Sequence, residues 1–138
     1  YASKPYLRQH GKPAQLSQLH DHKLIFYTRR ADRPSWSLST EDGKPLRFAF
    51  RPHLEADGAD LIREAILQGI GIGLLPSWMM IDPEAERRVE RVLPQHCGIE
   101  LPMQAVTTAA REPSPRQRAF IAHLRAEFDA VQALSLRG

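Results

Sequence analysis

Residues 61–76 read LIREAILQGIGIGLLP and contain three glycines at alternating positions, Gly69, Gly71 and Gly73. Upstream of the first glycine, apolar residues recur at the spacing of one helical face, at Leu61, Ile62, Ala65 and Ile66. The stretch therefore predicts a helix that ends at Gly69, because glycine adopts the left-handed conformation that closes a helix. The residues after Gly69 predict a short strand that is buried on both faces and ends at Pro76.

This order of elements argues against a nucleotide-binding loop. In a dinucleotide fingerprint a strand comes first, then the glycines, then a helix whose N-terminal amides face the pyrophosphate. Here the helix comes first, and the glycine spacing does not fit G-x-G-x-x-G. Gly71 and Gly73 are instead expected to let a neighbouring segment approach closely. At the other end of the helix, Asp57 is the predicted N-cap, and Asp60 favours the positive end of the helix dipole.

The whole chain has the composition of a globular protein. Its 138 residues are 42% hydrophobic and 25% charged, and no apolar run approaches the ~20 residues of a membrane span. The net charge of +3 comes with acidic residues scattered among the arginines, which gives little support for nucleic-acid binding by this segment. Cys97 is the single cysteine, and no signal peptide is recognisable, so we expect a cytoplasmic protein. The start at Tyr1 suggests a piece of a longer protein.

The residues before the opening stretch predict short helices and strands. Ser3 caps a helix that contains Pro5 and ends at Gly11, and a second short helix is expected over 13–19. KLIFYT at 23–28 predicts a strand. SWSLST and PLRFAF flank Glu41-Asp42-Gly43-Lys44, which is a strong signal for a β-hairpin.

The residues after it continue the alternation of helices and strands. One helical turn is expected over 77–81, and Asp82-Pro83 starts another helix. Strands are predicted over 89–94 and 101–109. Ser114-Pro115-Arg116-Gln117 is a capping box that opens a helix to about Leu134, with an apolar face that lacks an evident partner. This alternation predicts an α/β sheet with helices packed on it.

Residue clusters that could carry chemistry are few. His20-Asp21-His22 contains metal-ligand types, but adjacent residues do not easily converge on one ion and no spaced third ligand follows. A polar loop before the strand is the preferred interpretation. His96-Cys97 lacks a group that would orient a nucleophile, so Cys97 is expected to be a plain loop cysteine. We therefore expect no catalytic residues, no metal and no cofactor. Arg29-Arg30 are expected at the surface, with a rim that attracts an anionic ligand as the alternative.

The succession of motifs resembles the effector-binding domain of LysR-type transcriptional regulators. YASKPYLRQHGKP resembles the segment after the first crossing between the two halves of that domain. PLRFAFRPHLEADGADLIREAILQGIGIGLLPSWM resembles its most typical stretch, and VERVLP with LPMQAVTTAAREPSPRQRAFIAHL resembles its return segment and closing helix. Each motif alone is loose, and their order and spacing make the resemblance fairly specific.

The resemblance implies a two-lobed α/β fold of the periplasmic-binding-protein type 2 kind, with a Rossmann-like lobe and a mixed sheet. Residues 1–91 would form the second lobe, with the first hinge at its start. Residues 92–138 would contain the second hinge and the strand and helix that complete the first lobe. The beginning of the first lobe and the DNA-binding domain would lie outside this chain.

The resemblance also implies the site and the partners. The expected ligand-binding residues are Ser3, Lys4, Tyr27, Thr28, Ala56, Asp57 and Gly58. The implied function is to bind a small-molecule effector between the lobes and to control an N-terminal helix-turn-helix, with a homo-oligomer (dimer or tetramer) formed through the helix at 60–68 and the strand after it. The alternative is a solute-binding or enzymatic α/β domain of similar architecture.

Overall fold

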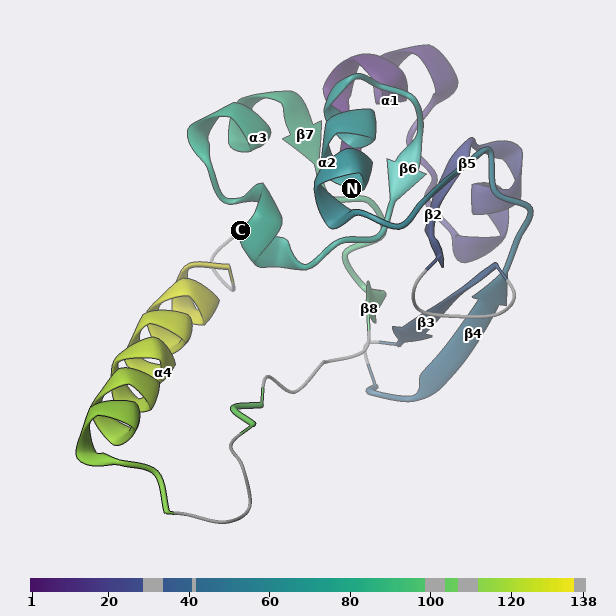
Figure 1. The fold of residues 1–138 in the computed structure, drawn as a ribbon. Helices are drawn as coiled ribbons and strands as arrows, with labels where there is room; N and C mark the ends of the chain where they lie inside the picture. Colours follow the sequence, from purple (N-terminus) through teal and green to yellow (C-terminus); the bar gives the residue numbers. More distant parts are fainter. Residues whose placement is uncertain (29–33, 41, 99–103, 107–111, 136–138) are drawn as a thin grey trace. The chain divides into compact units, whose positions relative to one another are not determined.

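The computed structural model describes residues 1–28, 34–40, 42–98, 104–106 and 112–135, with side chains up to residue 130 (Figure 1). The chain separates into two compact units, Tyr1–Ile99 and Glu100–Gly138, and each is described here by itself. Among the described residues, no helix combines the length and the apolar character that crossing a lipid bilayer requires.

Three parallel strands form the centre of the first unit. Their order is β5 (Leu54–Ala56), β2 (Leu24–Tyr27) and β6 (Ile72–Gly73). Successive side chains of a strand point to opposite faces. Leu24 accordingly packs into one apolar cluster, with α1 (Lys4–His10) and the β-hairpin, while Ile25 packs into the other, with α2 (Ala59–Leu67). The sheet is therefore covered on both faces, as an α/β fold requires, and the strand predicted at 23–28 is confirmed.

Helix α2 ends as the sequence predicts. The N–H of Ile70 donates to the carbonyl of Ala65 at 3.0 Å, and the N–H of Gly69 donates to Ile66 at 3.0 Å. This pair of bonds is a Schellman motif, and it requires the positive φ of 74° that Gly69 adopts. Ile62 and Ile66 are fully buried against the sheet.

The start of α2 differs from the prediction. The N-cap residue is Gly58, no side chain makes a capping hydrogen bond, and the predicted cap at Asp57 is wrong. An N-cap side chain must reach the amides of the second or third helical residue from the position next to the helix. Asp57 stands one residue too early for that contact.

The close approach expected at Gly71 and Gly73 is confirmed. A Cβ at Gly71 would lie 2.2 Å from the backbone oxygen of Lys23, and one at Gly73 would lie 2.7 Å from Cδ1 of Ile66. These glycines let β6 lie against β2 on one side and let α2 lie against β6 on the other. The glycines therefore allow close packing of β6 against the backbone of Lys23 and against α2.

The chain start pairs with a segment far along the sequence. β1 (Ala2–Ser3) runs antiparallel to β7 (Val89–Glu90), with Ser3 opposite Val89. The hydroxyl of Ser3 accepts from the N–H of Tyr6 at 3.3 Å, which confirms the predicted cap of α1. The strand predicted over 89–94 is confirmed only at its first two residues, and Leu93 beyond it adopts a positive φ of 52°, which no strand accommodates.

One short helix precedes β2, and two follow β6. These are η1 (Leu16–Asp21), η3 (Ser77–Met80) and α3 (Pro83–Arg88). The segment expected as a helix over 13–19 is instead a 3₁₀ helix that begins three residues later, held by hydrogen bonds to the Gln18 side chain. Asp82 caps α3, and its hydrogen bonds from Ala85 and Arg63 lower the pKa of its carboxyl group.

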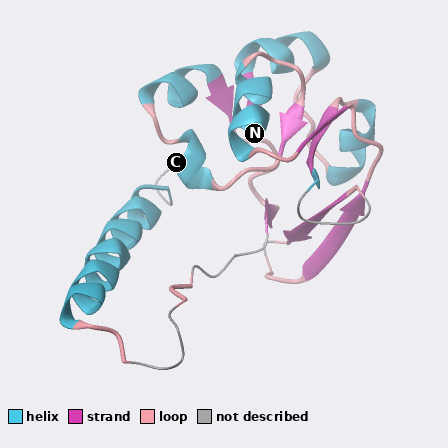
Figure 2. Cartoon of the chain, viewed as in Figure 1, coloured by secondary structure: helices cyan, strands magenta, loops and turns pink. Residues whose placement is uncertain are grey.

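A β-hairpin completes the first unit. β3 (Ser35–Ser39) and β4 (Pro45–Ala49) pair antiparallel, as the Asp-Gly signal predicts, and β8 (Cys97–Gly98) pairs with β3 on its other side. Figure 2 shows this three-stranded sheet separately from the parallel one. Phe48 is buried, whereas Arg47 and Ala49 beside it are exposed, so one face of β4 packs inward.

The described part of the second unit is mainly α4 (Pro115–Ser135). Ser114 and Gln117 exchange side-chain and backbone hydrogen bonds of 2.7 and 3.3 Å, which confirms the capping box. Phe120 is 62% exposed, and Leu124 and Phe128 are also exposed. Most of the strand predicted over 101–109 lies outside the described residues, and the described part, 104–106, contains no strand.

Candidate functional site

The carboxyl ends of β2 and β5 bring five of the predicted site residues together. Tyr27 and Ala56 lie opposite each other in the parallel register. The hydroxyl of Thr28 donates to the carbonyl of Ala56 at 3.4 Å, and Asp57 and Gly58 follow directly. Open parallel sheets bind ligands at this edge, where strands give way to helix starts.

The N-terminus of α2 opens at the same edge without a side-chain cap. The first intrahelical bond runs from the N–H of Ile62 to Gly58, at 3.2 Å. No described residue accepts a hydrogen bond from the preceding amides, those of residues 59–61. These amides carry the positive end of the helix dipole, so they favour a ligand with an acceptor or an anionic group.

Asp57 adds a complementary group beside these donors. Its side chain is exposed, and it forms no hydrogen bond or ion pair with any residue that the structure describes. Asp60 lies in the first turn of α2 and is also exposed. The edge therefore offers both free donors and free acceptors within a few residues.

Ser3 and Lys4 do not lie with the other predicted site residues. The hydroxyl of Ser3 is 3.1 Å from the position of a Cβ at Gly69, beyond the C-terminal end of α2. The nine residues of α2 separate this place from Gly58 by roughly 14 Å. Lys4 Nζ donates to the carbonyl of Glu86 in α3 at 3.2 Å, so Ser3 and Lys4 both have structural contacts.

Trp78 is a further candidate, although tryptophan more often packs in a core than contacts a ligand. It lies in η3, in the loop that follows the third parallel strand, β6, and its side chain is 51% exposed. Its neighbour Met79 packs in the same apolar cluster as Tyr27 and Ala59. The Leu-Pro pair that ends the strand is the signal that places a loop here.

The histidine and cysteine motifs contact separate groups in the structure. The ring of His20 lies 4.7 Å from that of Phe48, while Nδ1 of His22 lies 3.3 Å from the hydroxyl of Tyr6. In the described ranges, no three His, Cys, Asp or Glu side chains come together as metal ligands would. Cys97 is exposed, and its sulfur accepts from Arg91 at 3.0 Å.

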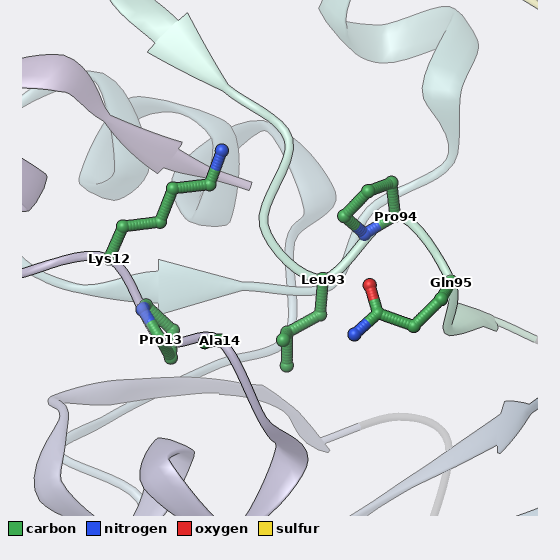
Figure 3. A pocket seen from close by; sticks show the side chains of 6 residues that line it. All are labelled: Lys12, Pro13, Ala14, Leu93, Pro94 and Gln95. Carbon is green, nitrogen blue, oxygen red and sulfur yellow. The ribbon is translucent and has the colours of Figure 1, made fainter.

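A cavity of about 240 Å³ lies away from the predicted site residues. It is bounded by the segments 12–14 and 93–95, whose side chains are drawn in Figure 3. Lys12 at its edge forms an ion pair with Glu90. The cavity contains none of the residues at the carboxyl edge of the sheet.

The sequence of this chain is similar to those of known transcriptional regulators. Residues 1–129 match the family profile described as LysR substrate binding domain. The chain is 33% identical over 138 residues to an HTH-type transcriptional regulator of Xanthomonas campestris pv. campestris, covering 94% of this chain and 39% of that protein. It is 26% identical over 128 residues to the HTH-type transcriptional regulator CrgA of Neisseria meningitidis serogroup C, covering 92% of this chain and 42% of that protein.

A solved structure agrees with this assignment. The regulatory domain of AphB from Vibrio vulnificus, treated with cumene hydroperoxide, superposes with a TM-score of 0.59 at 28% identity, over 69% of this chain and 47% of that one. The chain spans about two fifths of the length of the two regulators it matches. Its fold is of the periplasmic-binding-protein type 2 kind, and the chain belongs to the LysR substrate-binding domain family.

Proposed function

We propose that this chain is the effector-sensing part of a LysR-type transcriptional regulator, and that it controls a helix-turn-helix domain outside the chain. One observation carries the proposal: the uncapped start of α2 lies beside the free carboxylate of Asp57, at the carboxyl ends of β2 and β5. The relatives, which are named as HTH-type transcriptional regulators, support the role in transcription.

The chemistry of this edge defines a class of effector. The free amides of residues 59–61 favour a carboxylate or another acceptor, and Asp57 favours a donor or a cation. A small molecule with both groups, such as an α-amino acid, satisfies both. An anion without a donor would instead be repelled by Asp57.

The same proposal divides the chain between two lobes. Residues 1–91 form the second lobe, and residues 92–138 contain the second hinge and complete the first lobe. The pairing of β1 with β7 supports this division, because the proposed first hinge and the strand that leads to the proposed second hinge would then be neighbours. The exposed apolar residues of α4 are consistent with a helix that packs on the missing part of the first lobe.

The assembly is proposed to be a homo-oligomer built through α2 and the strand after it. Leu61 near the start of α2 is 62% exposed and Ile70 after its end is 38% exposed, so each end of this segment offers an apolar side chain to a second copy. A regulator of this kind works in the cytoplasm, where it reaches DNA.

The domain is proposed to bind its effector without transforming it. The imidazoles of His20 and His22 and the thiol of Cys97 contact separate groups, and the relatives named above are regulators. Replacing these three residues should therefore leave effector binding unchanged, whereas an enzyme that used them would lose turnover.

The test is to titrate the 138-residue chain with a panel of free L-amino acids and, as controls, simple carboxylic acids of similar size. We expect one or more amino acids to shift the ¹H–¹⁵N resonances of residues 59–61, and the variant Asp57→Asn to lose that shift. The matched control is Asp42→Asn, which changes an exposed carboxylate in the hairpin turn. If neither set of compounds shifts these amides, the proposed site is wrong. If only the simple acids do, the amino-acid class is wrong and the site stands.

A further inference from the structure

The three histidines nearest the chain start lie on the segments that precede β2. His10 ends α1, His20 lies in η1, and His22 is the C-cap of η1, two residues before the strand; these are three of the six histidines in the chain. Two of them flank one buried tyrosine. The ring centroid of Tyr6 lies 4.5 Å from that of His10 and 5.9 Å from that of His22.

The hydroxyl of Tyr6 joins this group to the strand. It accepts the N–H of Lys23 at 3.0 Å and lies 3.3 Å from Nδ1 of His22. A tyrosine hydroxyl has one proton, and Tyr6 can donate that proton to Nδ1 only if Nδ1 is unprotonated. With Tyr6 as the donor, His22 is neutral and carries its proton on Nε2.

Lys23 is the residue where three elements meet. Its N–H is held by Tyr6 of α1, and its carbonyl accepts from the N–H of Ile72 in β6 at 2.8 Å. The same carbonyl lies against Gly71, where no side chain fits. A change at the Tyr6 hydroxyl therefore acts on the backbone that aligns β2 with β6.

We propose that Tyr6, His10 and His22 form an acid-sensitive latch, which holds the start of β2 when His22 is neutral and weakens when His22 is protonated. Protonation places a hydrogen on Nδ1, so the hydroxyl of Tyr6 loses the acceptor for its own proton. Tyr6 is only 3% exposed, and a buried donor without a partner is costly. The latch does not require the effector. It makes the free energy of unfolding of the lobe decrease as the pH falls.

The charges around His22 fix the direction of the effect. His10 and Tyr6 face it from α1, and Asp21 faces it from η1. Burial lowers the pKa of His22, the charge of His10 lowers it further, and Asp21 partly opposes both. The folded chain therefore binds fewer protons at His22 than the unfolded chain does. The stability from this residue is present above the ordinary pKa of 6.5 and is lost as the pH falls toward the lowered value.

The first test is an NMR titration of the unmodified chain. We expect the His22 imidazole to titrate below pH 6.5 and the amide resonance of Lys23 to shift with the same midpoint. A His22 midpoint at or above the ordinary value would overturn the proposal, and so would a Lys23 amide that does not follow it. This measurement uses the unmodified chain, so its result does not depend on whether a variant folds.

The second test is the acid dependence of urea unfolding in His22→Asn. The amide oxygen of asparagine can accept the Tyr6 proton and does not titrate. Between about pH 7.5 and about pH 5, we expect the unfolding equilibrium constant of the unmodified chain to rise by a larger factor than that of the variant. His53→Asn is the control, because His53 is exposed and outside the latch. Equal acid responses in H22N and the unmodified chain would overturn the latch.

Discussion

The two ends of β2 differ in how their polar groups are used. At the amino end, the N–H and the carbonyl of Lys23 both have partners, and Gly71 leaves no space beside them. At the carboxyl end, the first amides of α2 and the carboxylate of Asp57 have no partner among the described residues.

This difference separates residues that stabilise the lobe from residues that can bind a ligand. Where the polar groups of a strand end are all paired and tightly packed, a substitution lowers the stability of the fold. Where they are unpaired and exposed, a substitution mainly changes ligand binding. Substitutions at the two ends should therefore change the free energy of unfolding by different amounts.

The largest effect is expected at Gly71. An alanine there would place Cβ 2.2 Å from the carbonyl of Lys23, so β6 must move away from β2. We expect Gly71→Ala to lower the free energy of unfolding by about 3 kcal/mol or more, measured by urea denaturation.

Gly58→Ala is the matched substitution at the open end. The nearest atom to its added Cβ is 3.6 Å away, and the φ of −110° suits alanine. We expect a loss below about 1 kcal/mol. Equal losses for G71A and G58A would remove the contrast between the two ends.

The next effect is expected at Ser3, which lies beyond the C-terminal end of α2. Ser3→Ala removes the acceptor for the N–H of Tyr6 and should cost about 1 kcal/mol of stability. It should leave the response to amino acids unchanged, since Ser3 lies away from the carboxyl edge. A lost response at unchanged stability would mean that Ser3 contacts the effector after all.

A smaller effect on stability is expected at Thr28. Its hydrogen bond to Ala56 is long, at 3.4 Å, so Thr28→Val should cost about 0.5 kcal/mol. The same variant should weaken the shifts that amino acids produce at residues 59–61. Thr28→Ser, which keeps the hydroxyl, should restore most of that response.

The smallest effect on stability is expected at Asp57. Its carboxylate is exposed and unpaired among the described residues, so Asp57→Asn should change the free energy of unfolding by less than about 0.5 kcal/mol. A thermal melt checks this directly. A large loss would show that Asp57 stabilises the fold, and the contrast between the two ends would then fail at this residue.

The elements with strong local signals could be predicted from the sequence. Gly69 closes α2, Ser3 and Asp82 cap their helices, Ser114 and Gln117 form the capping box, and Asp-Gly marks the hairpin. In each case the deciding interaction lies within a few residues of the signal. The residues next to each signal are therefore sufficient to predict these helix ends and the hairpin.

The elements that depend on distant partners could not be predicted as well. β5 and β8 were not expected, because three and two residues carry no readable periodicity and their partners are distant in sequence. The 3₁₀ form of η1 depends on the Gln18 side chain, which bonds backward to the amides of Ala14 and Gln15. The sequence predicts Asp57 as the N-cap of α2, but the N-cap is the next residue, Gly58.

The candidate site could be predicted in part. Five of its seven expected residues gather at one edge, because they follow two strands that pair in parallel register. Ser3 and Lys4 lie elsewhere, and only the tertiary packing of α1 against the far end of α2 reveals this. Whether the five residues contact an effector stays a prediction.

The pairing of β1 with β7 has a consequence for folding during synthesis. Ala2 and Ser3 are synthesised well before their partners Glu90 and Val89. Closing such a long loop is slow compared with forming a local helix or hairpin. The hairpin and α2 can therefore form while translation continues, and the first strand docks as one of the last steps.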